Sequence, residues 1–124
     1  MNQPKKVAED DAQADDISHH IHSRWKDLIQ EGQMLVFGPD QILFYQGHFP
    51  SGVFVLGKGK LALEKVDGGV LNSDVVEGEH KPIIGLDYLL TQSPYPFTAK
   101  TLTKSEVCFI SKSLIFNYLS QDKV

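Results

Sequence analysis

Short apolar runs alternate with glycine- and proline-containing breaks along most of this chain. After Gly32 the runs are QMLVF, QILFY, GVFVL, KLALEKV, LNSDVV, PIIGL, FTAKTL and EVCFI. Nearly all of the ten glycines lie in the breaks between these runs. Short strands at this spacing, with a turn signal between each pair, predict a sandwich or barrel rather than βαβ units.

Two segments show helical spacing instead of strand spacing. The first predicts an amphipathic helix that Asp15 or Asp16 caps and Gly32 ends in a left-handed turn; its apolar stripe is Ile17, Ile21, Trp25, Leu28 and Ile29. The second predicts a final helix from its stripe of Leu114, Ile115, Tyr118 and Leu119. Ser111 or Ser113 would cap this final helix. The sequence DYLLTQ is expected to form only one or two helical turns.

The N-terminal segment differs in composition from the rest. Residues 1–16 contain Asp, Glu, Gln, Ala and Lys and, apart from Met1, only one large apolar residue, Val7. Such a segment buries too little surface to offset its ordering entropy. We therefore expect a disordered acidic lead at 1–16 and one domain at 17–124.

Charge and cysteine content exclude several classes of function. The net charge is −4 and there is a single cysteine, Cys108. An acidic chain has no electrostatic footprint for nucleic acid, and one cysteine cannot form a disulfide within the chain. The sequence also lacks a membrane-spanning apolar run and a secretory signal, which predicts no membrane partner and a cytoplasmic protein.

The order of these elements resembles the cyclic nucleotide-binding domain, as found in sensor domains of the catabolite activator and FNR type of regulators. The resemblance covers about residues 33–119 and rests first on PDQILFYQGHFPSGVFVLGKGKLAL and then on SEVCFISKSLIFNYL. It implies a mainly β fold: a double-stranded β-helix (jelly-roll) barrel of about eight strands with flanking helices. FNR-type sensor domains that respond to signals other than cyclic nucleotides are the most similar subset, through GLDYLL and PYPFTAKTLTKSEVCFI.

The family's phosphate-binding cassette is matched only in part. Gly85, Pro96 and Ala99 stand at the family's glycine, proline and final alanine, and Thr98 stands at its serine or alanine place. However, Leu86 replaces the glutamate that binds the ribose, and Phe97 replaces the arginine that neutralises the phosphate. Loss of two charge-assisted hydrogen bonds predicts cyclic nucleotide binding that is weaker by about a hundredfold or more.

The candidate ligand-binding residues are therefore those of the cassette region: Gly85, Leu86, Asp87, Tyr88, Pro96, Phe97, Thr98 and Ala99. Asp87 accepts a hydrogen bond from a ligand or, as we favour, caps the short helix that follows. The other candidate chemistry is weaker. His19, His20 and His22 are too few for a metal site without further ligands, and Cys108 is expected to be a buried structural thiol.

Three hypotheses for function remain open. We favour a non-catalytic stand-alone sensor or adaptor domain with a degenerate cassette, which binds a non-standard small-molecule effector or a protein partner. The second is a cyclic nucleotide receptor with altered contacts, and the third is an interaction module whose pocket is filled by its own side chains. The sequence shows no catalytic motif, and the weakest reading is an enzyme of similar barrel shape, such as a cupin. No cofactor is expected, nor DNA binding by this chain alone. A homodimer is possible.

Overall fold

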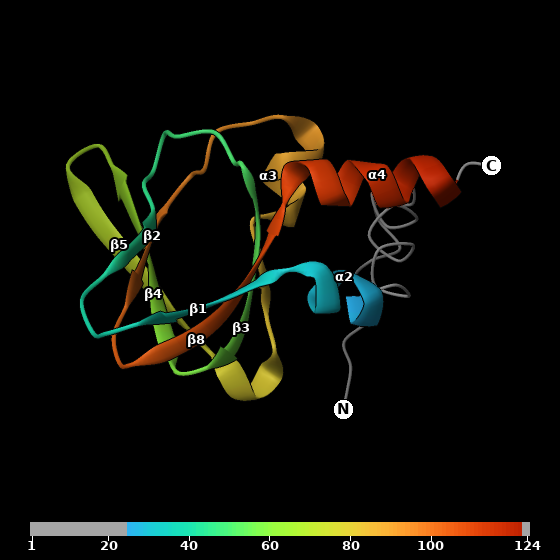
Figure 1. Ribbon diagram of the computed structural model, residues 1–124. Coiled ribbons are helices and arrows are strands. Elements are labelled where there is room, and N and C mark those ends of the chain that lie inside the picture. Colours follow the sequence, from blue (N-terminus) through green and yellow to red (C-terminus); the bar gives the residue numbers. More distant parts are fainter. Residues whose placement is uncertain (1–24, 123–124) are drawn as a thin grey trace, which may run out of the picture.

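The computed structural model describes residues 25–122 and consists of two four-stranded antiparallel sheets with three α-helices (Figure 1). The predictions for the acidic lead at 1–16, for the first part of the N-terminal helix and for the three neighbouring histidines lie outside the described residues. Within residues 25–122, no helix is both long enough and apolar enough to cross a membrane.

The first sheet, here called sheet A, contains the last long strand at its centre. Its order is β1-β8-β3-β6, and the strands are β1 Gln33–Phe37, β8 Ser105–Ser111, β3 Gly52–Lys58 and β6 Ile83–Ile84. All its pairs are antiparallel. Strand β3 is buried from Gly52 to Leu56, because it is covered on both faces.

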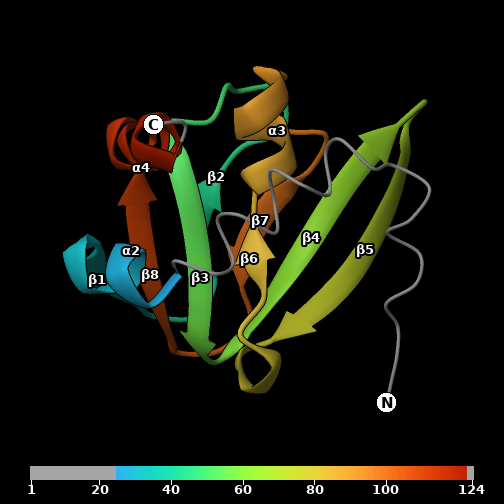
Figure 2. The same ribbon diagram turned by 90° about the vertical axis from the view of Figure 1, so that its right-hand side faces the viewer.

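The second sheet, here called sheet B, ends in a long hairpin. Its order is β2-β7-β4-β5, and the strands are β2 Ile42–Phe44, β7 Thr98–Thr101, β4 Lys60–Asp67 and β5 Val70–Glu77. The hairpin of β4 and β5 extends past the end of β7, which pairs with β4 only from Leu61 to Glu64 (Figure 2).

The side chain of Gln46 continues the sheet where β7 stops. Its amide donates to the carbonyl of Val66 and accepts from the N–H of Val66, both at 3.0 Å. One side chain thus satisfies the two backbone groups that a neighbouring strand would bind.

The mainly β jelly-roll fold with eight strands is confirmed, and one detail of the prediction is corrected. The sheets are not closed into a barrel: in the described part of the chain, β5 and β6 are edge strands that do not pair with each other. β6 has only two paired residues, so the run PIIGL makes a much shorter strand than its apolar length indicates.

Within residues 25–122, the helices cover one sheet only. The helices α2 Trp25–Glu31, α3 Leu86–Thr91 and α4 Lys112–Asp122 lie against sheet A, on the side of the molecule opposite the β4–β5 hairpin (Figure 1). They enclose a cluster of Leu28, Val53, Val55, Leu86, Leu89, Cys108, Ile110 and Ile115. A second cluster fills the space between the sheets: Phe44, Phe54, Leu56, Leu61, Ile84, Tyr95, Ala99 and Val107.

The prediction for the start of α4 is confirmed, whereas the prediction for the end of α2 is partly wrong. Ser111 accepts a hydrogen bond from the N–H of Leu114 at 3.2 Å, so the predicted cap of α4 is confirmed. Gly32 follows α2 as expected, but its φ is not positive, so the predicted left-handed turn is wrong. Glycine is required there for space, because a Cβ would lie 2.6 Å from Cys108 Sγ.

Candidate ligand cavity

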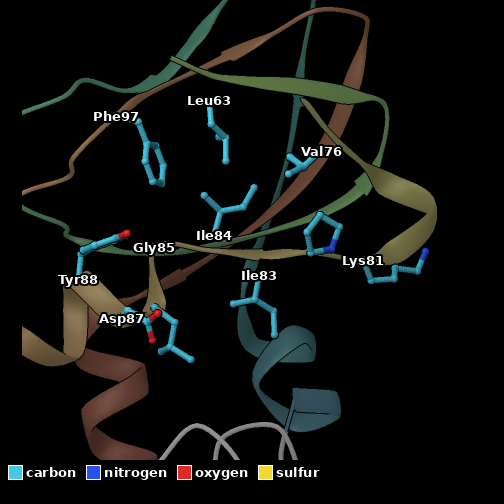
Figure 3. A pocket seen from close by; sticks show the side chains of 11 residues that line it. Leu63, Val76, Lys81, Ile83, Ile84, Gly85, Asp87, Tyr88 and Phe97 are labelled. Atoms are coloured by element: carbon cyan, nitrogen blue, oxygen red, sulfur yellow. The ribbon is translucent and has the colours of Figure 1, made fainter. Parts of the chain in front are cut away.

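A cavity of about 470 Å³ opens between the edge strands of the two sheets, bordered by β6, the start of α3 and the inner face of the β4–β5 hairpin (Figure 3). The lining residues are Leu63, Val76, Lys81, Pro82, Ile83, Ile84, Gly85, Leu86, Asp87, Tyr88 and Phe97. This volume lies within the usual range for small-molecule sites.

Gly85 makes the sharp turn from β6 into α3. Its φ is 96°, a left-handed conformation that costs glycine nothing, and its carbonyl accepts the N–H of Leu89 at 3.0 Å. A Cβ at this position would lie 3.1 Å from the ring of Tyr95. Both the backbone conformation and the close approach of Tyr95 therefore require glycine here.

Two aromatic residues of the lining, Phe97 and Tyr88, belong to a larger aromatic group that continues behind the wall with Phe44 and Tyr95. Tyr95 is 3% exposed and stacks on Phe44, with ring centroids 3.6 Å apart. Phe97 lies 5.8 Å from Phe44 and meets Tyr88 edge-on, also at 5.8 Å. Burial raises the pKa of Tyr95 to about 12. The hydroxyl of Tyr95 therefore stays neutral at physiological pH.

The segment that carries Phe97 is held in place by backbone hydrogen bonds. Tyr95 donates to the carbonyl of His48 and accepts from the N–H of Gly47, both at 2.8 Å. The C-terminal end of α3 is closed by Gln92, whose φ is 56°, and Ser93 donates to the carbonyl of Tyr88 at 2.9 Å. The wall is therefore fixed at both ends.

Apolar side chains face the cavity from both sheets. Phe97, Leu63, Val76 and Ile84 surround the same space, and Tyr88 directs its hydroxyl toward it (Figure 3). Asp87 and Ile83 lie on the other side of β6 (Figure 3). The interior of the cavity is thus mostly hydrocarbon and aromatic.

The charged residues of the lining sit at its rim. Lys81 is exposed, its amine lies 3.5 Å from the carbonyl of Gly57, and it points away from Phe97 and Leu63 (Figure 3). Asp87 is exposed in the first turn of α3, whose N-cap is Gly85 and has no side-chain cap bond. Our prediction that Asp87 caps this helix is therefore wrong.

Five of the eight candidate residues line the cavity: Gly85, Leu86, Asp87, Tyr88 and Phe97. They differ in surroundings, because Leu86 is 6% exposed and packs mainly into the cluster beneath the helices. Phe97, in contrast, packs against the cluster between the sheets.

The other three candidates have structural surroundings and do not line the cavity. Ala99 is fully buried between the sheets. The hydroxyl of Thr98 accepts the N–H of Gln46 at 2.9 Å, and Pro96 is half-buried.

The sequence reading missed six lining residues: Leu63, Val76, Lys81, Pro82, Ile83 and Ile84. In KLALEKV, large apolar residues occupy every second position at Leu61 and Leu63. This alternation indicates that both side chains point inward, so the sequence contained a signal for Leu63. That Val76 lies opposite β6 depends on the order of strands, which the alternation does not contain.

Other candidate chemistry is sparse in the described part. Cys108 is 4% exposed, its thiol lies 3.7 Å from the carbonyl of Ile29, and burial raises its pKa. Among residues 25–122, no three His, Cys, Asp or Glu side chains gather as a metal site would require.

Comparison with known proteins agrees with this geometry. The family model of the cyclic nucleotide-binding domain matches residues 34–122. This chain belongs to the cyclic nucleotide-binding domain family. The match includes every residue that lines the cavity.

Solved structures of this domain family share the fold. The catabolite activator protein of Thermus thermophilus is 14% identical, with a TM-score of 0.72, and the match covers 84% of this chain and 51% of that protein. This chain thus spans about half the length of that regulator.

Two further structures are comparably similar. The sensor domain of the transcriptional regulator DNR from Pseudomonas aeruginosa is 16% identical, with a TM-score of 0.70 and coverage of 86% and 75%. A transcriptional regulator of Thermotoga maritima is 22% identical, with a TM-score of 0.67 and coverage of 80% and 78%. These three structures are thus a catabolite activator protein, a transcriptional regulator and the sensor domain of another transcriptional regulator.

Proposed function

We propose that this cyclic nucleotide-binding-type domain is a non-catalytic sensor whose cavity takes a small, neutral and largely apolar effector instead of a cyclic nucleotide. The observation that carries this proposal is the position of Phe97. It stands at the family's arginine place and its ring faces the cavity, where a phosphate would need a cation.

The charge distribution supports the same conclusion. Of the described residues that line the cavity, the only cation is Lys81, and its amine points out of the cavity. A buried phosphate without a charged partner would lose its hydration and gain only backbone dipoles in return. A neutral ligand avoids that cost and gains from contact with Leu63, Val76 and Ile84.

The packing of α3 supplies a route from the cavity to the surface helices. Leu86 and Leu89 of α3 share one buried cluster with Leu28 of α2 and Ile115 of α4. A ligand that displaces the start of α3 would therefore change the packing under α4. Such a shift of a packed helix is a known form of regulatory transition.

Cyclic nucleotide binding through other contacts is the second candidate, and membership of the family favours it. The third hypothesis, a self-filled pocket, is disfavoured because Phe97 and Leu86 leave about 470 Å³ of space between the sheets' edges.

Calorimetry with cAMP and cGMP tests the proposal. We expect no saturable heat from the wild-type chain at concentrations that saturate receptors with an intact cassette, because about a hundredfold in affinity is missing. Phe97→Arg should improve cAMP affinity by about tenfold by restoring one charged contact. Phe49→Arg is the matched control, since Phe49 is exposed and outside this cavity. Micromolar binding by the wild-type chain would instead establish the second candidate.

A thermal-shift screen with small neutral metabolites addresses the effector. A compound that binds only the folded state raises the melting temperature. Leu63→Gln, which places an amide in the cavity, should abolish that shift, and Leu102→Gln at an exposed position should leave it unchanged. A shift that survives Leu63→Gln would place the compound elsewhere.

A further inference from the structure

Strand β5 is an unusually open sheet edge. It pairs with β4 over eight consecutive residues without a bulge, and in the described part of the chain nothing pairs with its other side. Natural edge strands are commonly protected by lysine, proline, bulges or short length. The sequence VLNSDVVE contains neither lysine nor proline.

The outer face of the β4–β5 hairpin carries three exposed apolar side chains near its free edge and its turn. Directly paired residues share one face of an antiparallel sheet, so Val66 and Leu71 lie side by side, and Val75 lies on the same face. These side chains are 53%, 60% and 54% exposed. A surface with this much uncovered hydrocarbon beside a free backbone edge indicates an interaction site.

The backbone groups that point to the free edge can be identified. Gly68 and Gly69 have φ values of 60° and 81°, as in a two-residue type I′ turn, so Asp67 and Val70 form a hydrogen-bonded pair. Bonded and non-bonded pairs then alternate along the hairpin. The bond from Gly78 N–H to the Gly59 carbonyl, 2.9 Å, fits this alternation. The N–H and C=O groups of Leu71, Ser73, Val75 and Glu77 therefore point outward.

We propose that β5 pairs antiparallel with β5 of a second copy of this chain, with Ser73 on the two-fold axis, to give a continuous eight-stranded sheet. This inference is independent of the ligand proposed above.

The sequence of β5 is complementary to itself in this register. Leu71 of one copy lies opposite Val75 of the other, and Val70 lies opposite Val76. Asn72 lies opposite Asp74, with Lys65 next in the same row, because Lys65 pairs with Asn72. One exposed apolar row, of Leu71 and Val75, and a second row of exposed Val70 and half-buried Val76 are thereby extended across the axis. Each Asp74 carboxylate faces an amide and a nearby cation.

Neighbouring registers are less favourable. A two-fold axis perpendicular to the sheet places the same face of both copies on the same side of the joined sheet. The axis therefore passes through a residue and not between two residues, so the neighbouring registers have it at Asn72 or at Asp74. An axis at Asp74 places two carboxylates directly opposite each other and Leu71 opposite Glu77. An axis at Asn72 pairs Leu71 with Ser73 and Val70 with Asp74. Of these three registers, the axis at Ser73 alone pairs Leu71 and Val70 with valines and avoids like charges.

Sedimentation equilibrium of the 124-residue chain and of two variants at Asn72 tests the interface. We expect a monomer–dimer equilibrium whose dissociation constant rises about tenfold in Asn72→Asp, since two Asp–Asp contacts form, and falls in Asn72→Lys. Within one chain the charge effects have the opposite sign, because Asn72 pairs with Lys65. A general loss of folding therefore cannot produce this pattern. Asn117→Asp on the exposed side of α4 is the matched control and should not change the association.

Cysteine crosslinking tests the register. A mixture of Asn72→Cys and Asp74→Cys chains should form a disulfide-linked dimer, because opposite residues of an antiparallel pair are within disulfide range. Neither variant alone should crosslink at a comparable rate, and Cys108 does not compete because it is buried. The proposal is overturned if either single variant crosslinks as fast as the mixture, if the mixture does not crosslink, or if the wild-type chain stays monomeric at the highest soluble concentration.

Discussion

Sheets A and B have equal numbers of strands but very different surroundings. The outer face of sheet A is covered by three helices, and its central strand β3 is buried. In the part of the chain that the structure describes, no helix covers the outer face of the β4–β5 end of sheet B, and β5 is exposed over nearly its whole length. The cavity lies at the seam where the edge strands of the two sheets approach each other.

This difference separates the origins of stability and interaction. The covered sheet gains its stability from hydrophobic burial on both faces, whereas the hairpin of sheet B rests on backbone pairing and on few buried side chains. We therefore expect the interactions of the domain with ligands and with other chains to take place at sheet B and at the seam.

The largest expected contrast comes from matched truncations on the two sheets. Ile110→Ala, in the fully buried cluster of sheet A, should lower the free energy of unfolding by about 2–5 kcal/mol. Val66→Ala on the bare face of sheet B should cost at most about 1 kcal/mol. Urea denaturation measures both values, and equal costs would contradict the division between the sheets.

A smaller contrast is expected between two glycines with left-handed φ. Gly85→Ala should cost about 1–2 kcal/mol from the backbone conformation and more from the ring of Tyr95 at 3.1 Å. Gly69→Ala in the β4–β5 turn has the same kind of backbone cost but open space around the Cβ. The difference between the two melting curves isolates the contact with Tyr95. If Gly69→Ala is the more harmful change, the seam is not as tightly packed as described.

The smallest effect is confined to alkaline pH and concerns Tyr95 between the sheets. Its pKa in the folded state is raised to about 12 by burial, whereas an unfolded tyrosine ionises near 10. The folded state therefore holds its proton longer, and the stability from neutral Tyr95 is present below about pH 10 and is lost between about pH 10 and 12.

The matched variant for this prediction is Tyr95→Phe, which cannot ionise. The difference in free energy of unfolding between wild type and Tyr95→Phe should be constant below about pH 9 and should shrink or reverse toward pH 12. Chemical denaturation at several pH values measures it. A constant difference up to pH 12 would show that the hydroxyl is not shielded from water.

Much of the fold was predictable from local patterns. The strands appear in the sequence because alternation and turn residues are local signals, and the jelly-roll assignment followed from their order together with the family resemblance. The open seam was not predictable, because PIIGL reads as a full strand while only Ile83 and Ile84 find a partner in β3. Pairing partners, rather than propensity, decide that length.

The candidate site was predictable on one side only. The cassette resemblance located Gly85, Tyr88 and Phe97, which do line the cavity. It could not locate Leu63 and Val76, since their place in the cavity depends on the curvature and order of sheet B. It also placed Pro96, Thr98 and Ala99 in the site. These residues do not line the cavity, because neighbouring side chains along an extended segment point in different directions.

The Gln46 side chain described above joins the β4–β5 hairpin to the segment that carries Phe97, next to it in the fold. Its amide binds Val66 in the hairpin, its own N–H binds the hydroxyl of Thr98, and the adjacent Gly47 binds the carbonyl of Tyr95. The mechanical consequence is that a single short loop fixes the spacing between the hairpin and the segment that carries Phe97. A guest molecule that pushes the hairpin away from Phe97 has to stretch or break these hydrogen bonds.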